Sequence, residues 1–442
     1  MVIMKYNILK YFFVGTVIIL SAYTLSAQKC VNPNVQSNRL DYRDLGYPAA
    51  TEIPGDNAHI GALLSHSNGQ IYGATSGKQS YLFHFDTMTN KVYPLGQIAS
   101  EKGVHHCLAE GADGLIFIGT GLNELEIPVL SKDVPYGRRT IEYQLWDDIK
   151  ARYSGYEGGH IYVYDPSEGD GEIYLDAAKA KVKDLGVAVP GNSIYTMTIN
   201  ADKTKIYGIS YPDAVFFEYD IEKAKFTSYG EWLAEKSYSG PERSWRSVPR
   251  AVLCGSDGKV YSSGNNGLIY CFDPASKNVA QTYMRIPGEY WETQNYNGYP
   301  VVEQLIEVAP GLVYGTSSDG FLFRFDLESQ TLRVLGKPRV ERRVRAMTLG
   351  NDDRLYMICG EKDNVCRMFS YDLAGEEGFL DYGVLGVDRS PYYAKIAYQF
   401  DAMCTGEDGT IYIGEGDRRG KLFFYVPGGT VVKGALNPTN PR

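Results

Sequence analysis

The chain has 442 residues, of which 44% are apolar, and a formal net charge of −9. The apolar content suffices for a large core, whereas the net negative charge argues against a nucleic-acid-binding protein, which normally carries a basic surface. The 36 Tyr and 48 Gly favour β-structure with many turns, and the seven scattered Cys, with no CxxC pair, argue against a zinc ribbon or a disulfide-dense scaffold.

The first 27 residues have the pattern of a signal peptide. Two lysines precede the apolar run 11–20, and Leu25-Ser26-Ala27 offers a small-residue cleavage site. Cys30 follows Lys29 instead of a small residue, so lipidation is not expected. We therefore expect an exported protein, periplasmic or extracellular, with no stable membrane insertion after cleavage. An uncleaved membrane anchor is the alternative.

Seven similar units follow along the chain, at 59–75, 106–120, 195–210, 250–264, 303–317, 345–359 and 401–415. The clearest lies within residues 248–274, where three predicted strands (251–255, 259–262 and 268–272) are separated by Asp-Gly and Asn-Gly turns. Such turns between short apolar runs indicate consecutive hairpins. A fourth strand at 278–283 follows. Each unit is thus predicted to be a four-stranded antiparallel sheet.

Seven such units predict an all-β fold, a seven-bladed β-propeller, in which radial closure protects the sheet edges. Six of the seven third strands end in Asp, which starts the turn into the fourth strand. The seventh lacks this Asp, but Leu40–Leu45 resembles the fourth strands of other units. We expect this N-terminal segment to close the ring, with Thr430–Lys433 as the competing candidate. Residues 28–442 are then a single domain.

Two insertions interrupt the repeat, at residues 122–158 and 229–248. The first contains a helix-like run, 141–152, and the second is rich in aromatic residues and Arg. Long connections in a compact fold are usually lids or binding loops, although either segment could be a plain surface loop.

The start of each innermost strand carries a comparable position, called here the hub slot. Its residues are Gly61, His106, Tyr195, Arg250, Glu303, Arg345 and Asp401. Two residues later comes an apolar row, Leu63, Leu108, Met197, Val252, Leu305, Met347 and Met403. Because strand side chains alternate, both rows should point the same way. The apolar row is predicted to be buried, and the polar row to surround the mouth of the central channel.

Polar side chains at six of the seven slots are more than packing requires, because buried polar groups are costly unless they pair or serve a ligand. The competing interpretation is that Arg345 with Asp401, and Arg250 with Glu303, are structural ion pairs. Outside the slots, His59 should face the mouth, and Tyr211 should lie beside it.

The remaining histidines and tryptophans have weaker indications. His105 should alternate away from the channel unless a bulge exchanges it with His106. His66 and His84 fit packing or surface positions. His160 could equally be a site residue or a packing residue. Trp232, Trp245 and Trp291 could stack on sugar rings or simply pack; we include Trp245 among the candidate substrate-binding residues.

This set of side chains suits β-elimination at a uronic acid. Arg and His can offset the carboxylate charge, which makes the proton on the adjacent carbon removable. A Tyr or His can act as base and acid. Any protein that binds acidic sugars would also use Arg and His. The His spacing predicts no metal site, and with no GxSxG, P-loop or GxGxxG motif we expect no cofactor.

The signal peptide, the seven degenerate repeats of the form IYxGT…G.LF.FD and the His/Tyr/Arg hub resemble the seven-bladed propeller polysaccharide lyases, which include ulvan lyases and rhamnose-glucuronate lyases. The resemblance implies metal-independent cleavage next to a uronic acid. It assigns His106 and Arg250 to the substrate carboxylate, Tyr195 or Tyr211 to acid and base, and His59 to a further contact. Asp401 would contact sugar hydroxyls.

We therefore expect an exported, monomeric polysaccharide lyase whose substrate is an acidic polysaccharide or oligosaccharide. His105, Glu303 and Arg345 complete the candidate substrate-binding residues. Three alternatives stay open: a non-catalytic glycan- or protein-binding propeller, a metal-dependent propeller hydrolase or lactonase, and a relative of the metal-dependent oligogalacturonate lyases. Cys359 and Cys366, on adjacent strands of one hairpin, could form a disulfide.

Overall fold

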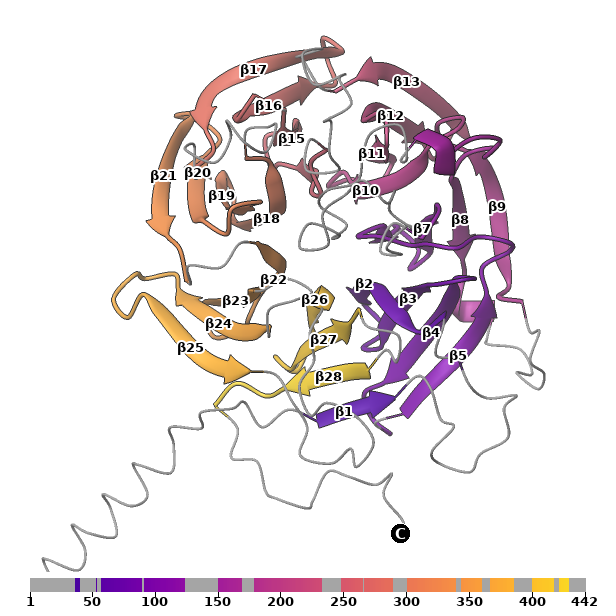
Figure 1. The fold of residues 1–442 in the computed structure, drawn as a ribbon, viewed down its shortest axis with the longest axis horizontal. Coiled ribbons are helices and arrows are strands. Elements are labelled where there is room, and N and C mark those ends of the chain that lie inside the picture. The colour runs from indigo at the N-terminus through magenta and orange to yellow at the C-terminus, as the bar shows by residue number, and fades with distance from the viewer. Residues whose placement is uncertain are drawn as a thin grey trace, which may run out of the picture.

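The structure is a computed structural model that describes residues 36–39, 53, 57–89, 91–123, 150–168, 179–232, 248–264, 266–288, 300–338, 343–359, 366–384, 400–416 and 421–428. Within them the chain forms seven four-stranded antiparallel sheets arranged in a ring (Figure 1). The predicted seven-bladed β-propeller is therefore confirmed.

Each blade takes four strands. Blade 1 contains β2 (His59–Ser65), β3 (Ile71–Ser76), β4 (Tyr81–Asp86) and β5 (Lys91–Gln97). Blade 2 contains β6 (Leu108–Glu110), β7 (Ile116–Gly119), β8 (His160–Tyr164) and β9 (Val182–Val187), with a short 3-10 helix, η5 (Pro166–Glu168). Blade 3 contains β10 (Ser193–Ile199), β11 (Lys205–Tyr211), β12 (Val215–Asp220) and β13 (Lys225–Glu231). Blade 4 contains β14 (Leu253–Cys254), β15 (Val260–Ser263), β16 (Leu268–Asp273) and β17 (Asn278–Arg285).

The remaining three blades follow the same order. Blade 5 contains β18 (Val302–Ala309), β19 (Leu312–Ser317), β20 (Leu322–Asp326) and β21 (Thr331–Gly336). Blade 6 contains β22 (Val344–Leu349), β23 (Arg354–Cys359), β24 (Arg367–Asp372) and β25 (Phe379–Val384). Blade 7 contains β26 (Phe400–Thr405), β27 (Ile411–Glu415), β28 (Lys421–Tyr425) and, from the other end of the chain, β1 (Gln36–Arg39).

The ring is closed by an N-terminal strand, as predicted, but the strand lies earlier than predicted. β1 pairs antiparallel with β28, from Gln36 opposite Phe424 to Arg39 opposite Lys421, and the two strands lie side by side at the edge of the ring (Figure 1). The predicted segment Leu40–Leu45 and its competitor Thr430–Lys433 lie outside the described residues. An outermost strand needs chiefly main-chain pairing, so its side-chain pattern is a weak guide to its position.

The turns have the chemistry that the repeats indicated. The six Asp residues at the ends of third strands each accept a backbone amide of the following turn; they are Asp86, Asp165, Asp220, Asp273, Asp326 and Asp372. In all seven blades the hairpin between the first and second strands has a residue with positive φ, and in five of them it is Gly. This backbone conformation costs Gly little.

The inner strands form the wall of the central channel. Each contacts the first strands of the neighbouring blades, in the order β2, β6, β10, β14, β18, β22 and β26, and β26 contacts β2 again. The apolar side chains between neighbouring sheets form the core. This wall brings residues from both ends of the sequence to one axis.

Several predicted features fall wholly or partly outside the described residues. These include the signal peptide 1–27, residues 124–149 of the first insertion and residues 233–247 of the second. Residues 150–152 form a helical turn at the end of the predicted run 141–152, and β13 extends to Glu231, so the first residues of the predicted second insertion belong to this strand. Cys359, at the end of β23, and Cys366, directly before β24, are both buried. No helix within the described ranges is long and apolar enough to cross a membrane.

Candidate functional site

The hub slots are places where the regular pairing of the inner strands is interrupted. In blades 1, 3, 5, 6 and 7 the slot residue is the extra residue of a β-bulge, without its own partner on the second strand: Gly61, Tyr195, Glu303, Arg345 and Asp401. In blade 2, His106 precedes β6 with a φ of 46°. Bulges redirect side chains and are frequent beside active sites.

The predicted burial of the apolar row is only partly right. Met197, Val252 and Met347 are buried as predicted, whereas Leu63, Leu108, Leu305 and Met403 are partly exposed. In blades 1, 5 and 7 a bulge breaks the strict alternation of side chains on which the prediction depended. Leu108 is partly exposed without such a bulge.

Asp401 and Arg345 form the tightest contact of the hub. Nε of Arg345 donates to Oδ1 of Asp401 at 2.9 Å, and Nη2 donates to the same oxygen. Both side chains are almost fully buried. Burial alone would raise the pKa of Asp401, but the charge of Arg345 and the hydrogen bond from His59 outweigh it and hold this pKa well below its usual value. Asp401 is therefore an ionised carboxylate.

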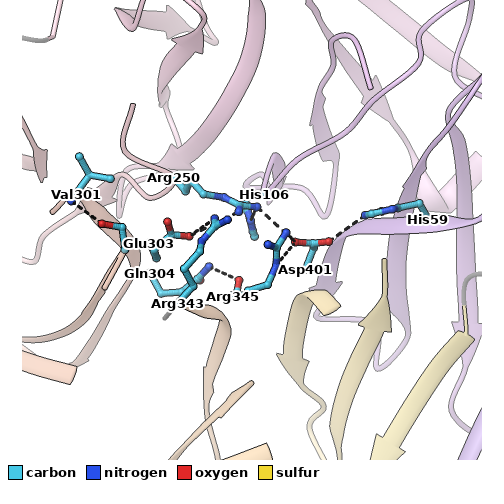
Figure 2. A network of polar contacts seen from close by, with 10 residues as sticks. His59, His106, Arg250, Val301, Glu303, Gln304, Arg343, Arg345 and Asp401 are labelled. Carbon is cyan, nitrogen blue, oxygen red and sulfur yellow. Dashed lines mark hydrogen bonds and ion pairs between the residues drawn. The ribbon is translucent and has the colours of Figure 1, made fainter. Parts of the chain in front are cut away.

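Arg250 lies between the two buried carboxylates of the hub. Its Nη1 is 3.6 Å from Oε2 of Glu303, and its Nη2 is 3.6 Å from Oδ1 of Asp401. The predicted pairing of Arg250 with Glu303 is thus present but loose. Figure 2 shows Arg250 above this group, with Glu303 on one side and Asp401 on the other.

Arg343 is a hub residue that the sequence analysis missed. Its Nη2 donates to Oε2 of Glu303 at 2.8 Å, and both side chains are buried. Arg343 comes two residues before the slot residue Arg345, as His59 comes two residues before Gly61. The rule that selected His59 would therefore have found Arg343. Its φ of 66° is unusual for a residue other than Gly and represents backbone strain, which is often found at functional sites.

Arginines outnumber carboxylates in the part of this contact network that the structure describes. The three guanidiniums of Arg250, Arg343 and Arg345 lie beside the two carboxylates of Glu303 and Asp401. Oε1 of Glu303 is buried and accepts no hydrogen bond from the described residues. Among those residues, no group of three or more His, Cys, Asp or Glu is arranged to hold a metal ion.

His106 contacts Arg250 and is neutral. Nη2 of Arg250 is 3.2 Å from Nε2 of His106. A guanidinium can only donate, so Nε2 is the acceptor and the ring proton is on Nδ1. Burial, followed by the charge of Arg250, lowers the pKa of His106 well below its usual value. The partly exposed His106 ring therefore presents an N–H donor.

His59 joins the hub from blade 1, as predicted. Its Nε2 is 3.0 Å from Oδ2 of Asp401 in blade 7, and 12% of its side chain is exposed. Gly416 makes this contact possible, because a Cβ there would overlap Oδ2 of Asp401 and lie 2.7 Å from the His59 ring. His105 lies close to this group but is buried, with Nε2 donating to the carbonyl of Leu122 at 3.3 Å. Burial lowers the pKa of His105 to about 3.

The two candidate tyrosines lie together, and Tyr195 is beside Arg250. The rings of Tyr195 and Tyr211 are 5.1 Å apart, and the Arg250 guanidinium carbon is 5.9 Å from the centre of the Tyr195 ring. Tyr153, at the end of the first insertion, packs on Tyr211 at 6.0 Å. The structure thus brings Tyr195 and Tyr211 to the hub, with exposures of only 5% and 2%.

The other histidines have structural partners. His66 accepts from the amide of Asn68 and contacts the carbonyl of Gly114, and His84 packs between Tyr72 and Tyr93. Both fit the predicted packing positions. His160 stacks on Tyr162 and contacts Asp184 at 2.9 Å.

The tryptophans do not add to the described hub. Trp232 is buried and donates to the carbonyl of Ser263 at 2.9 Å, so it packs in the core and cannot stack on a sugar. Trp245 and Trp291 lie outside the described residues.

Comparisons with known proteins bear on the fold. No family model matches the sequence, and no curated protein matches it. A solved streptogramin B lyase is similar, with 11% identity, a TM-score of 0.56 and coverage of 89% of this chain and 98% of that chain. The extracellular domain of a protein described as a one-component system of B. thetaiotaomicron is also similar, with 12% identity, a TM-score of 0.52 and coverage of 88% of this chain but 39% of that chain. At these identities the likeness establishes the β-propeller fold alone.

Proposed function

We propose that this propeller is an exported polysaccharide lyase that cleaves a glycosidic bond next to a uronic acid, glucuronate for example, by β-elimination without a metal. The observation that carries the proposal is the gathering of three guanidiniums at the hub, with Arg250 next to a neutral imidazole that offers an N–H donor. A sugar carboxylate is the kind of group that such a site attracts, because charge-assisted hydrogen bonds to carboxylates are strong.

The proposed roles follow from the contacts. Arg250 and His106 bind the carboxylate and offset its charge, which stabilises the negative charge that develops when the adjacent carbon loses its proton. Tyr195 or Tyr211 supplies the proton for the leaving oxygen. The Tyr195 ring is near Arg250, and the Tyr211 ring is next to that of Tyr195, which supports binding of one sugar beside all of these groups.

The streptogramin B lyase neighbour supports enzymatic use of such a fold, because its name describes it as a lyase. We do not infer the same substrate for this chain, because function depends on the residues of the site and not on the fold. The second structural neighbour is an extracellular domain, which is compatible with export of this chain.

A second candidate is a non-catalytic propeller that binds acidic glycans. The observation in its favour is the low exposure of Tyr195 and Tyr211, together with the close pairing of Arg345 with Asp401 and of Arg343 with Glu303. A binding module needs positive charge at the hub but no accessible acid.

The two candidates differ in their products. With chelator present, a lyase acting on a panel of glucuronate glycans forms unsaturated uronate, measured by its ultraviolet absorbance, together with new reducing ends. Tyr195→Phe and Tyr211→Phe identify the acid by loss of turnover with binding kept. Reducing ends without absorbance indicate hydrolysis, and binding without either product supports the binding module.

A further inference from the structure

His59 and Asp401 have complementary hydrogen-bonding roles. Because Asp401 is ionised, it can only accept, so Nε2 of His59, at 3.0 Å, is the donor. In the neutral form of the His59 ring, the proton is therefore on Nε2 and the lone pair on Nδ1. A carboxylate that fixes the tautomer and orientation of an imidazole in this way makes the opposite ring nitrogen a base.

Nδ1 of His59 is available for such a role. It makes no hydrogen bond with the described residues and is not among their fully buried polar atoms, and the side chain is 12% exposed. Tyr195 and Tyr211 are less exposed. Two imidazoles on neighbouring blades thus have opposite roles, His106 with an N–H donor and His59 with an acceptor nitrogen on the ring edge opposite its contact with Asp401.

The carboxylate that orients His59 is itself held firmly. Arg345 donates twice to the other oxygen of Asp401, and Arg250 lies 3.6 Å from that oxygen. His105, from the loop before β6, also lies near His59, and its lowered pKa keeps it neutral. Within the described residues, the charged group in contact with His59 is the Asp401 carboxylate, which stabilises the imidazolium that proton uptake forms.

We propose that His59 is the general base of the elimination and that Asp401 is the residue that positions it, an inference that depends on the function proposed above. Nδ1 takes the proton from the carbon next to the carboxylate, and the electron pair of that C–H bond forms the carbon–carbon double bond. The bond to the leaving oxygen breaks with its electron pair on oxygen, which takes a proton from Tyr195 or Tyr211. Transfer of the proton from His59 back to the tyrosine then completes the cycle.

The test uses the full chain and compares His59→Ala with a matched variant, His84→Gln, whose histidine packs away from the hub. Turnover is followed by unsaturated uronate across a pH series, with and without added imidazole. We expect His59→Ala to lower kcat by about 100- to 10,000-fold, to lose the acidic limb of the pH profile, and to recover part of kcat with imidazole. His84→Gln should keep the wild-type kcat.

The outcomes separate the two proposals. If the wild-type chain forms unsaturated uronate and His59→Ala keeps its kcat or its acidic limb, the base role of His59 is overturned while the lyase stands. If the wild-type chain binds the glycans without forming product, the lyase itself is overturned, and the base role with it.

Discussion

Nε2 of His59 lies 3.0 Å from Oδ2 of Asp401, although 342 residues separate them in the sequence. The contact links the first strand of blade 1 to the first strand of blade 7, where the ring closes. Polar contacts then continue from Asp401 to Arg345 and Arg250, as Figure 2 shows. The hub is therefore assembled only when the whole propeller has closed.

Gly416 should be essential for this contact. In Gly416→Ala the new methyl group must displace the Asp401 carboxylate or the His59 ring. A displacement of about 1 Å in a catalytic group costs about 100-fold in rate, so we expect a loss of that size in kcat of the folded variant.

The matched control is Gly414→Ala on the same strand, where the added Cβ would meet Ile60 in the apolar layer. This variant should unfold at lower urea concentration but keep its specific activity. Equal specific activity in Gly416→Ala and the wild type would contradict the prediction.

Removing one partner of the buried pair should destabilise the fold strongly. Asp401→Ala leaves the buried Arg345 without its carboxylate, and such losses cost about 3–5 kcal/mol. Asp381→Ala breaks the exposed pair with Arg367 and should cost less than about 1 kcal/mol. Urea unfolding of both variants measures the difference.

A double variant tests whether this cost comes from the uncompensated charge. Arg345→Met combined with Asp401→Leu removes both charges, so it should be more stable than Asp401→Ala alone. If it is less stable, the buried pair contributes more than the charge argument allows.

Glu101 should make stability fall as pH rises through the mildly acidic range. Burial raises its pKa from 4.5 to about 7, and the Tyr156 hydroxyl donates to it at 3.3 Å. The folded state therefore keeps a proton that the unfolded state loses above about pH 4.5, so this contribution is full below that pH and is lost as pH approaches 7.

The variant Glu101→Gln isolates this contribution, because the lowered pKa of His105 acts in the opposite sense between about pH 3 and 6.5. The difference in unfolding free energy between the variant and the wild type should change in favour of the variant as pH rises from 4.5 to 7. A difference that is constant with pH would contradict the raised pKa.

The repeats made the fold predictable, because turn residues and alternating strands are local features. The same register predicted which residues would gather at the hub, namely His59, His106, Tyr195, Tyr211, Arg250, Glu303, Arg345 and Asp401. Arg343 was missed although it comes two residues before its slot residue, as His59 does, but its positive φ had no signal in the sequence. The register also did not reveal that slots such as Asp401 are bulges, or that Gly416 leaves room for His59, because both depend on strands far apart in sequence.

The most direct test of the proposed lyase compares the wild-type chain with Arg250→Ala on glucuronate glycans, in chelator, by ultraviolet absorbance of the unsaturated product. Arg367→Ala, on the third strand of blade 6 and paired with Asp381, serves as control. We expect a rising signal for the wild type and the control, and a loss of about 100- to 1,000-fold for Arg250→Ala, as when a group that stabilises developing charge is removed. Equal rates for the wild type and Arg250→Ala, or no absorbance from the wild type on any glycan, would contradict the account.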